Sequence, residues 1–232
     1  MPYTFAPPSK MSFSKIALLL ALPVVLASCG SKDLISSDQP AAPTLPTVPS
    51  EPEFVNPFPE GTYDHFKAEP NYKKTYNVYR NHYLLSSMTP DSASLVINLG
   101  TQRAQLLHDG QVAMDYPVAT GKSSHPTPPG EYKILEKIKD KRSNTYGRIL
   151  NASGGVVNSD ADARKDKIPA GGKFLGASMP YWMRFTWTGI GHHVGNVPRY
   201  PASHGCIRGK RSTMPEVYSK VKVGTPVSIV EY

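Results

Sequence analysis

The chain has 232 residues, a formal net charge of +8 and a hydrophobic content of 39%. Its basic residues are spread along the chain and do not form the run or face that is typical of nucleic-acid-binding proteins, so we exclude nucleic acid as a partner. A modest positive charge suits an anionic envelope polymer or a lipid surface.

An export signal is predicted near the N-terminus. Lys15 precedes an apolar run from Ile16 to Leu26, which is too short to span a membrane comfortably as a helix. The sequence LASC, which ends at Cys29, resembles the lipobox of bacterial lipoproteins. That resemblance implies cleavage before Cys29 and diacylation of its sulfur, and two acyl chains give stable anchoring. The alternative is an ordinary secretory signal that ends near Ala27 and leaves Cys29 free.

The predicted lipoprotein signal peptide covers residues 1–29, and Met11 is a more natural start than Met1 because residues 1–10 have no signal character. Gly30 is not the aspartate associated with retention at the inner membrane. We therefore expect a periplasm-facing lipoprotein of the cell envelope, anchored in the outer membrane.

Three further segments follow the signal. Residues 30–60 hold seven prolines between Pro40 and Pro59, so we expect a disordered, extended linker that shares no core with the domain. Residues 61–93 are predicted to be a connector. Residues 94–232 have the length of one domain and are predicted to be mainly β, with one or two short helices.

The strands of this domain are predicted from alternation of apolar and polar residues. Two such runs are followed by Asp109-Gly110, a strong hairpin signal, and by a returning strand. A helix is predicted between Ser212 and Gly224, because Thr213 and Glu216 have capping-box spacing. The strands are expected at 94–99, 103–108, 111–120, after the Pro-Gly turn in 127–138, as one strand over Arg184–His193, and at 225–232.

The segment RYPASHGCIRG, from Arg199 to Gly209, holds the second cysteine of the chain, Cys206. If Cys29 is lipidated, Cys206 is the only thiol of the mature protein, and a disulfide between the two is excluded. A nucleophilic cysteine needs a base or a positive environment. His204 shares a face with Cys206 on an extended segment, and His193 could reach it across a loop.

Other residues of the segment suit acyl transfer. Gly205 lets the backbone bend so that the Cys206 amide points at a developing oxyanion, and Arg208 could hold a substrate carboxylate. Two alternatives remain open. Cys206 could be a packed core residue, or it could bind zinc or copper with His192, His193 and His204.

SHGCIR resembles the signature of the L,D-transpeptidase (YkuD-type) family, and the likeness extends over about the last 140 residues. It implies a β-sandwich catalytic domain without metal or cofactor, in which a cysteine attacks the stem tetrapeptide of peptidoglycan and passes the acyl group to an amine. By position, the resemblance implies that Cys206 is the nucleophile, His193 the general base and His204 a catalytic residue of the oxyanion side. It also implies substrate-binding roles for Ser203, Gly205, Arg208, Tyr181 and Trp182.

Three departures from the family pattern bear on these roles. The interval from His193 to Ser203 is short, Val194 stands where glycine is common, and His192 is a second candidate base. The product could be a 3-3 cross-link or an envelope lipoprotein attached to peptidoglycan. The alternatives are a hydrolase that uses the same acyl-enzyme, or a non-catalytic lipoprotein that binds peptidoglycan or metal.

Overall fold

The structure, a computed structural model, describes residues 54–232. The predicted signal peptide, the lipidation of Cys29 and most of the proline-rich linker lie outside these residues. No helix in residues 54–232 is long and apolar enough to cross a membrane.

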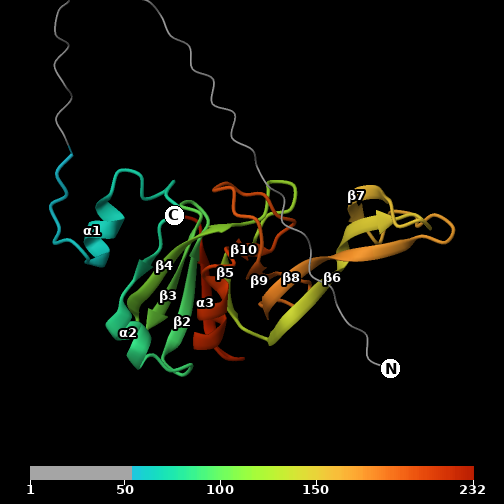
Figure 1. Cartoon of the computed structure of the whole chain (residues 1–232). Coiled ribbons are helices and arrows are strands. Elements are labelled where there is room, and N and C mark those ends of the chain that lie inside the picture. The colour runs from blue at the N-terminus through green and yellow to red at the C-terminus, as the bar shows by residue number, and fades with distance from the viewer. Residues whose placement is uncertain (1–53) are drawn as a thin grey trace, which may run out of the picture. The chain divides into compact units, whose positions relative to one another are not determined.

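Strands dominate this part of the chain, and three helices are short (Figure 1). The helices are α1 (Tyr63–Ala68), α2 (His82–Ser87) and α3 (Met214–Lys220). The strands are β1 (Tyr79–Arg80), β2 (Ala93–Asn98), β3 (Arg103–His108), β4 (Gln111–Ala119), β5 (Gly130–Lys133), β6 (Glu136–Leu150), β7 (Val156–Asp162), β8 (Lys173–Arg184), β9 (Gly191–Val194), β10 (Ile207–Gly209) and β11 (Pro226–Val230). The prediction of a mainly β fold with few helices is confirmed.

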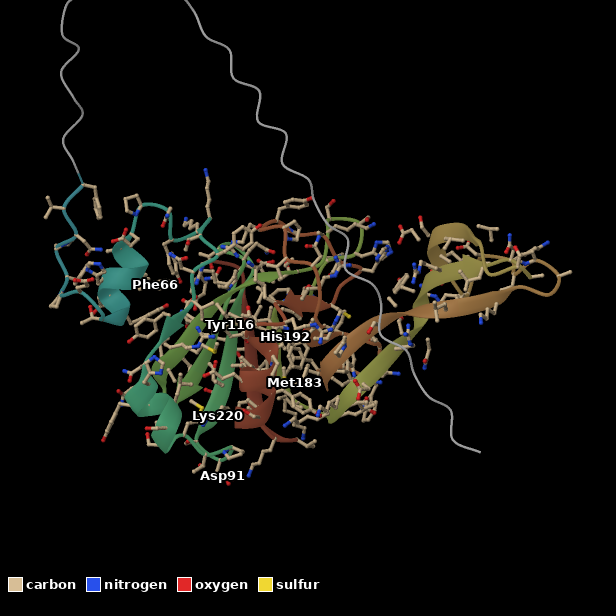
Figure 2. The ribbon with its side chains drawn as sticks, in the orientation of Figure 1. Phe66, Asp91, Tyr116, Met183, His192 and Lys220 are labelled. Carbon is tan, nitrogen blue, oxygen red and sulfur yellow. The ribbon has the colours of Figure 1, made fainter. Side chains whose placement is uncertain are left out.

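The strands follow the order β5-β11-β2-β3-β4-β10-β9-β8-β6-β7, and β1 pairs with β4. Most neighbours are antiparallel, whereas β11 runs parallel to β2 and β10 parallel to β9. The long strand β4 divides this order into two halves, with β5, β11, β2 and β3 in the first and β10, β9, β8, β6 and β7 in the second. It joins them because it pairs with β3 and with β10. Buried side chains from both halves and from α3 form one hydrophobic core, which includes Leu95, Leu106, Met183, Ile207 and Val217. Figure 2 labels Met183 among the side chains that fill the space between the ribbons.

The hairpin of β3 and β4 follows the predicted turn. Asp109 and Gly110 have φ values of 46° and 80°, and His108 pairs with Gln111. Positive φ at both central residues matches the twist of the flanking strands, and Asp-Gly adopts it readily. The sequence therefore predicted this hairpin and its turn correctly.

The prediction of one strand over Arg184–His193 is wrong. The chain leaves β8, turns over Thr186–Gly189 and returns as β9, which pairs antiparallel with β8. The Thr186 hydroxyl accepts a hydrogen bond from the Ile190 amide, and Gly189 has φ +106°. A side-chain acceptor and a glycine make a tight turn here, although the surrounding residues favour an extended chain.

The capping box predicted for α3 is also absent. The Thr213 hydroxyl donates to the carbonyl of Lys210 and caps nothing, and Glu216 forms an ion pair with Arg80. The helix ends at Lys220, four residues before Gly224.

The predicted connector, residues 61–93, packs on the sheet. The hydroxyls of Tyr63 and Tyr72 each donate to Asp115 on β4 at 2.8 Å, and Asp115 also accepts from Arg103 at 2.5 Å. Arg103 donates further to main-chain carbonyls of the connector, those of Tyr72, Thr75 and Asn77. Burial, together with the charge of Asp115, raises the pKa of Tyr72 to about 12. A buried ion pair thus holds the connector against the sheet.

Candidate active site

The parallel pairing of β9 and β10 brings the predicted catalytic residues together. His193 is the partner of Arg208, and His192 is the partner of Ile207. Because successive side chains of a strand point to opposite faces, Cys206, Arg208 and His193 share one face. Ile207 and His192 share the other, where both are fully buried.

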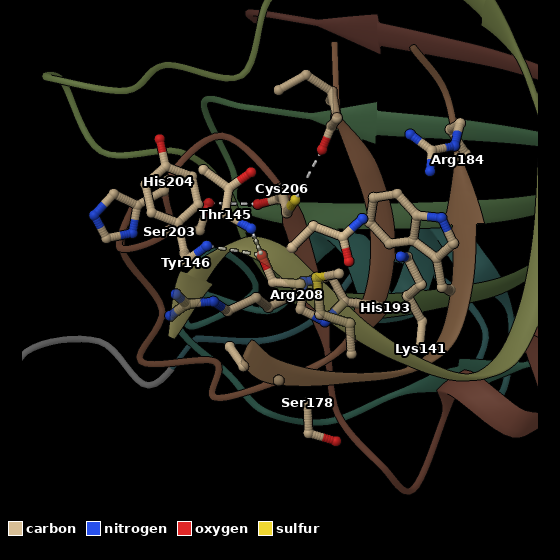
Figure 3. Close-up of a pocket in the computed structure, with 18 of the residues that line it drawn as sticks. Lys141, Thr145, Tyr146, Ser178, Arg184, His193, Ser203, His204, Cys206 and Arg208 are labelled. Carbon is tan, nitrogen blue, oxygen red and sulfur yellow. Dashed lines mark hydrogen bonds between the residues drawn. The ribbon is translucent and has the colours of Figure 1, made fainter. Parts of the chain in front are cut away.

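This face lines a cavity of about 550 Å³. Its opposite wall is the arm formed by β6 and β8, which contributes Tyr146, Ser178 and Trp182. The turn between β8 and β9 closes the third side with Trp187 and Gly189. Figure 3 shows Cys206 in the middle of the cavity, with His204 on one side and Arg184 and Lys141 on the other.

Cys206 is a free thiol that lines the cavity and is partly buried. Its sulfur donates to the carbonyl of Gly189 at 3.4 Å. Burial raises the pKa of the thiol above its ordinary value, although the amide of Gly191 and the charges of Arg208 and Arg184 act in the opposite direction. The resting thiol is therefore neutral at pH 7, and it needs a base to become a nucleophile.

His193 has a free nitrogen suited to that role. Its Nδ1 lies 2.8 Å from the carbonyl of Val194, and a carbonyl can only accept, so Nδ1 carries the proton and Nε2 carries the lone pair. Burial lowers the pKa of His193 to about 4, despite the hydrogen bond to Val194. The imidazole is neutral at pH 7. Val194 supplies its backbone carbonyl, so the absence of glycine at this position does not matter.

His192 has a structural environment. Its Nδ1 donates to the carbonyl of Ile207 at 2.9 Å, and its Nε2 lies 3.0 Å from the Tyr116 hydroxyl. The Tyr116 ring stacks on it at 5.9 Å. Burial lowers the pKa of His192 to about 4. Both ring nitrogens are occupied in the core, so His192 holds the residue after Cys206 and does not reach the thiol.

The Ser203–Cys206 loop is held in a bent conformation. The Ser203 hydroxyl accepts from the Gly205 amide at 3.1 Å and donates to the Cys206 carbonyl at 2.5 Å. Thr127 donates to the Gly205 carbonyl at 2.7 Å. Gly205 has φ +106°, a region that residues with a side chain rarely adopt. The Cys206 amide has no hydrogen-bond partner within residues 54–232, so it can serve a developing oxyanion.

His204 does not share the face of Cys206. The expectation of an extended segment is wrong, because the bend at Gly205 turns the two side chains apart. The His204 ring stacks on Tyr146 at 4.4 Å and meets His125 edge-on at 4.8 Å. Its Nε2 lies 3.9 Å from Asp160, and burial lowers its pKa. His204 therefore joins the catalytic loop to the β6–β8 arm as part of the cavity wall.

Trp182 and Tyr181 have different positions. Trp182 lines the cavity, and its indole N–H donates to Glu136 at 3.1 Å. Tyr181 contacts the core on the other face and meets Tyr218 edge-on at 5.4 Å. The prediction that Tyr181 forms part of the aromatic wall is wrong, since adjacent strand residues point in opposite directions.

Several cavity residues were missed by sequence reasoning. Trp187 and Gly189 lie in the turn that was predicted as strand, and Tyr146 and Lys141 belong to a strand whose length was not predicted. A Thr-Gly pair inside an apolar run is a signal that could have indicated the turn. Within the described residues, no group of three metal-ligating side chains comes together.

Comparisons with known proteins support one family. The model of the L,D-transpeptidase catalytic domain (YkuD) matches residues 92–229. L,D-transpeptidase 1 of Mycobacterium tuberculosis is 26% identical over 149 residues, which cover 61% of this chain and 52% of that protein. This chain thus spans about half the length of that relative.

Solved structures of the family show the same likeness. An L,D-transpeptidase from Mycobacterium smegmatis is 22% identical with a TM-score of 0.46 and covers 60% of this chain and 58% of that one. The catalytic domain of an E. faecium L,D-transpeptidase is 26% identical with a TM-score of 0.43, over 59% of this chain and 95% of that one. Since the family model matches residues 92–229, more than half of the chain, and a thiol, a histidine and a free amide line one cavity, the chain belongs to the YkuD family of L,D-transpeptidase catalytic domains.

Proposed function

We propose that this protein is a peptidoglycan L,D-transpeptidase. Cys206 attacks the carbonyl between the third and fourth residues of a stem tetrapeptide, expels D-alanine and passes the acyl group to an amine. The observation that supports this proposal is the placement of a free thiol, a histidine lone pair and an unpaired amide around one cavity. Those are the nucleophile, base and oxyanion donor that acyl transfer needs.

The protons and bonds of the reaction balance with these three groups. Nε2 of His193 takes the thiol proton as sulfur bonds to the carbonyl carbon, and the Cys206 amide donates to the oxyanion. Collapse breaks the C–N bond, and His193 returns the proton to the leaving amine. An acceptor amine then attacks the thioester and regenerates the thiol.

The two resting groups are both neutral, since the pKa of Cys206 is raised and that of His193 is lowered. A preformed thiolate–imidazolium pair is therefore disfavoured. The proton moves as the C–S bond forms, as expected for general base catalysis.

The experiment incubates the purified protein with a stem tetrapeptide and an amine acceptor. We expect release of D-alanine, a thioester mass on Cys206 and a 3-3 linked product, and none of these with Cys206→Ser. A tripeptide without cross-linked product would support the hydrolase instead. Turnover by Cys206→Ser would contradict both.

We also propose that the mature protein is a lipoprotein anchored through Cys29 in the outer membrane and facing the periplasm, where an envelope lipoprotein could serve as the acceptor. The lipobox-like LASC and the proline-rich residues 30–60 support this arrangement. Cys29→Ala should move the protein from the membrane fraction to the soluble fraction and leave Cys206 chemistry intact. Acylated, membrane-bound protein after this substitution would contradict the anchor.

A further inference from the structure

The Cys206 amide, which serves as the oxyanion donor in the proposed function, belongs to the same peptide unit as the Gly205 carbonyl. A peptide unit is planar, and this one is trans, so its N–H and its C=O point in opposite directions. Whatever holds the carbonyl therefore fixes the direction of the amide. Among residues 54–232 this carbonyl accepts one hydrogen bond, which the Thr127 hydroxyl donates at 2.7 Å.

The two neighbouring peptide units are held by a different side chain. The Ser203 hydroxyl accepts from the Gly205 amide, in the unit before, at 3.1 Å, and it donates to the Cys206 carbonyl, in the unit after, at 2.5 Å. It bonds to neither group of the middle unit. The middle unit, which carries the oxyanion donor, therefore depends on Thr127.

The middle unit needs a restraint because it begins at a glycine. Gly205 has φ +106°, and a Cβ there would lie 2.8 Å from Cδ1 of Ile190, so the position excludes a side chain. Glycine allows many backbone conformations, and in one of them the peptide unit is turned over. The Gly205 carbonyl oxygen would then point to the place where the oxyanion forms and would repel it.

Thr127 is held rigidly in the fold. It is 3% exposed and has Pro126 and Pro128 on either side, which restrict its backbone. Its hydroxyl oxygen accepts from the Gly121 amide at 2.9 Å, so the hydroxyl hydrogen is left for the Gly205 carbonyl. A Cβ at Gly121 would lie 2.7 Å from the Thr127 nitrogen, so a glycine is required for this approach.

The hydrogen bond from Thr127 has two effects on the Cys206 amide. It fixes the plane of the peptide unit with the N–H directed away from Thr127. It also polarises the unit, because donation to the carbonyl strengthens the N–H as a donor. Thr127 does not line the cavity, so its influence on the reaction passes through the amide.

We infer that Thr127 is a positioning residue of the reaction: its hydroxyl holds the Gly205 carbonyl, so that the Cys206 amide of the same peptide unit is directed at the oxyanion. This inference rests on the proposed function and adds a residue that acts through the oxyanion donor. Loss of the hydroxyl should therefore slow the steps that develop an oxyanion and no others.

The test compares two reactions of the Cys206 thiol. Release of D-alanine from a stem tetrapeptide in a single turnover passes through an oxyanion, whereas alkylation by iodoacetamide forms a C–S bond by displacing iodide and develops none. Thr127→Val keeps the shape of the side chain and removes the hydroxyl. Acylation at saturating tetrapeptide should slow by about 10- to 100-fold, less than the ~10²- to 10³-fold loss of a whole oxyanion donor. The half-saturating concentration of tetrapeptide and the alkylation rate of Cys206, measured by mass spectrometry, should stay unchanged.

Two further variants serve as controls. Thr127→Ser keeps the hydroxyl and should restore most of the acylation rate. Thr213 is fully buried, and its hydroxyl donates to the Lys210 carbonyl at 3.0 Å without lining the cavity. Thr213→Val therefore loses a comparable hydrogen bond, and it should lower stability and leave both reaction rates unchanged.

The outcomes separate the inference from the proposed function. Normal acylation by Thr127→Val overturns the inference and leaves the transpeptidase intact. Equal slowing of acylation and alkylation also overturns it, because the loop as a whole would then have lost its structure. A Thr127→Ser protein as slow as Thr127→Val does the same. Absence of D-alanine release by the unmodified protein overturns the proposed function, and the inference with it. If Thr127→Val fails to fold, Thr127→Ala takes its place, and the same comparison of the two reactions decides.

Discussion

At the scale of single residues, His192 and His193 have different roles, because their side chains point to opposite faces of β9. His193→Ala should reduce acylation of Cys206 about 10²- to 10⁴-fold, the range of general base catalysis, with little loss of stability. His192→Ala should instead lower the free energy of unfolding by about 2–4 kcal/mol, because it opens a buried space and leaves the Tyr116 hydroxyl and the Ile207 carbonyl without partners.

Single-turnover acylation by a β-lactam and urea unfolding of both variants measure these two effects. A stable His193→Ala protein that acylates at the normal rate would show that another group is the base. Loss of acylation in a well-folded His192→Ala protein would instead show that the face assigned to each histidine is wrong.

The raised pKa of the Cys206 thiol predicts its reactivity toward a small alkylating agent. Below the thiol pKa the neutral form dominates, so alkylation by iodoacetamide at pH 7 should be slower than that of a simple thiol and should still increase above pH 9. Mass spectrometry of a Cys29→Ala protein, in which Cys206 is the remaining thiol, measures the rate against pH. A plateau below pH 8 would mean that the thiol is activated at rest.

At the scale of elements, the sequence was most informative where one local rule decides the structure. The alternation of apolar and polar residues, together with the Asp109-Gly110 turn, predicts the hairpin of β3 and β4. Adjacent residues of a strand point to opposite faces, and this rule separates the side chain of His192 from that of His193. The SHGC segment indicated Cys206 as the nucleophile. Each of these inferences depends on neighbours in the chain.

The elements that were missed depend on hydrogen bonds between side chains and the backbone, some of them local and some between distant residues. The turn after β8 is held by Thr186, and the bend at Gly205 by Ser203 and by Thr127, 78 positions away. The place of Arg208 depends on Gly195 and on two neighbouring strands. Periodicity carries no information on such contacts, so it predicted an extended chain at both bends and the wrong face for His204.

At the scale of the whole domain, the described segment before residue 92 belongs to the folded unit, although the family match begins only at 92. Asp115 is fully buried, and its neighbour Arg103 is 1% exposed. Both depend on the tyrosine hydroxyls and main-chain carbonyls of residues 63–77. Without that segment, a buried ion pair would face water on one side and would lose several of its hydrogen bonds.

A chain of residues 92–232 should therefore be less stable than one of residues 54–232, by about 3 kcal/mol or more, since each lost hydrogen bond to a charged group contributes ~1.5–3 kcal/mol. Arg103→Met in the longer chain should cost about 3–5 kcal/mol, because it leaves a buried carboxylate unpaired. Tyr83→Ala, which removes an exposed ring of α2, is the control and should change stability by less than about 0.5 kcal/mol. Urea unfolding measures all four proteins. Equal stability of the two chains would show that residues 54–91 are dispensable, and the buried pair of Arg103 and Asp115 would then have to be satisfied within the sheet alone.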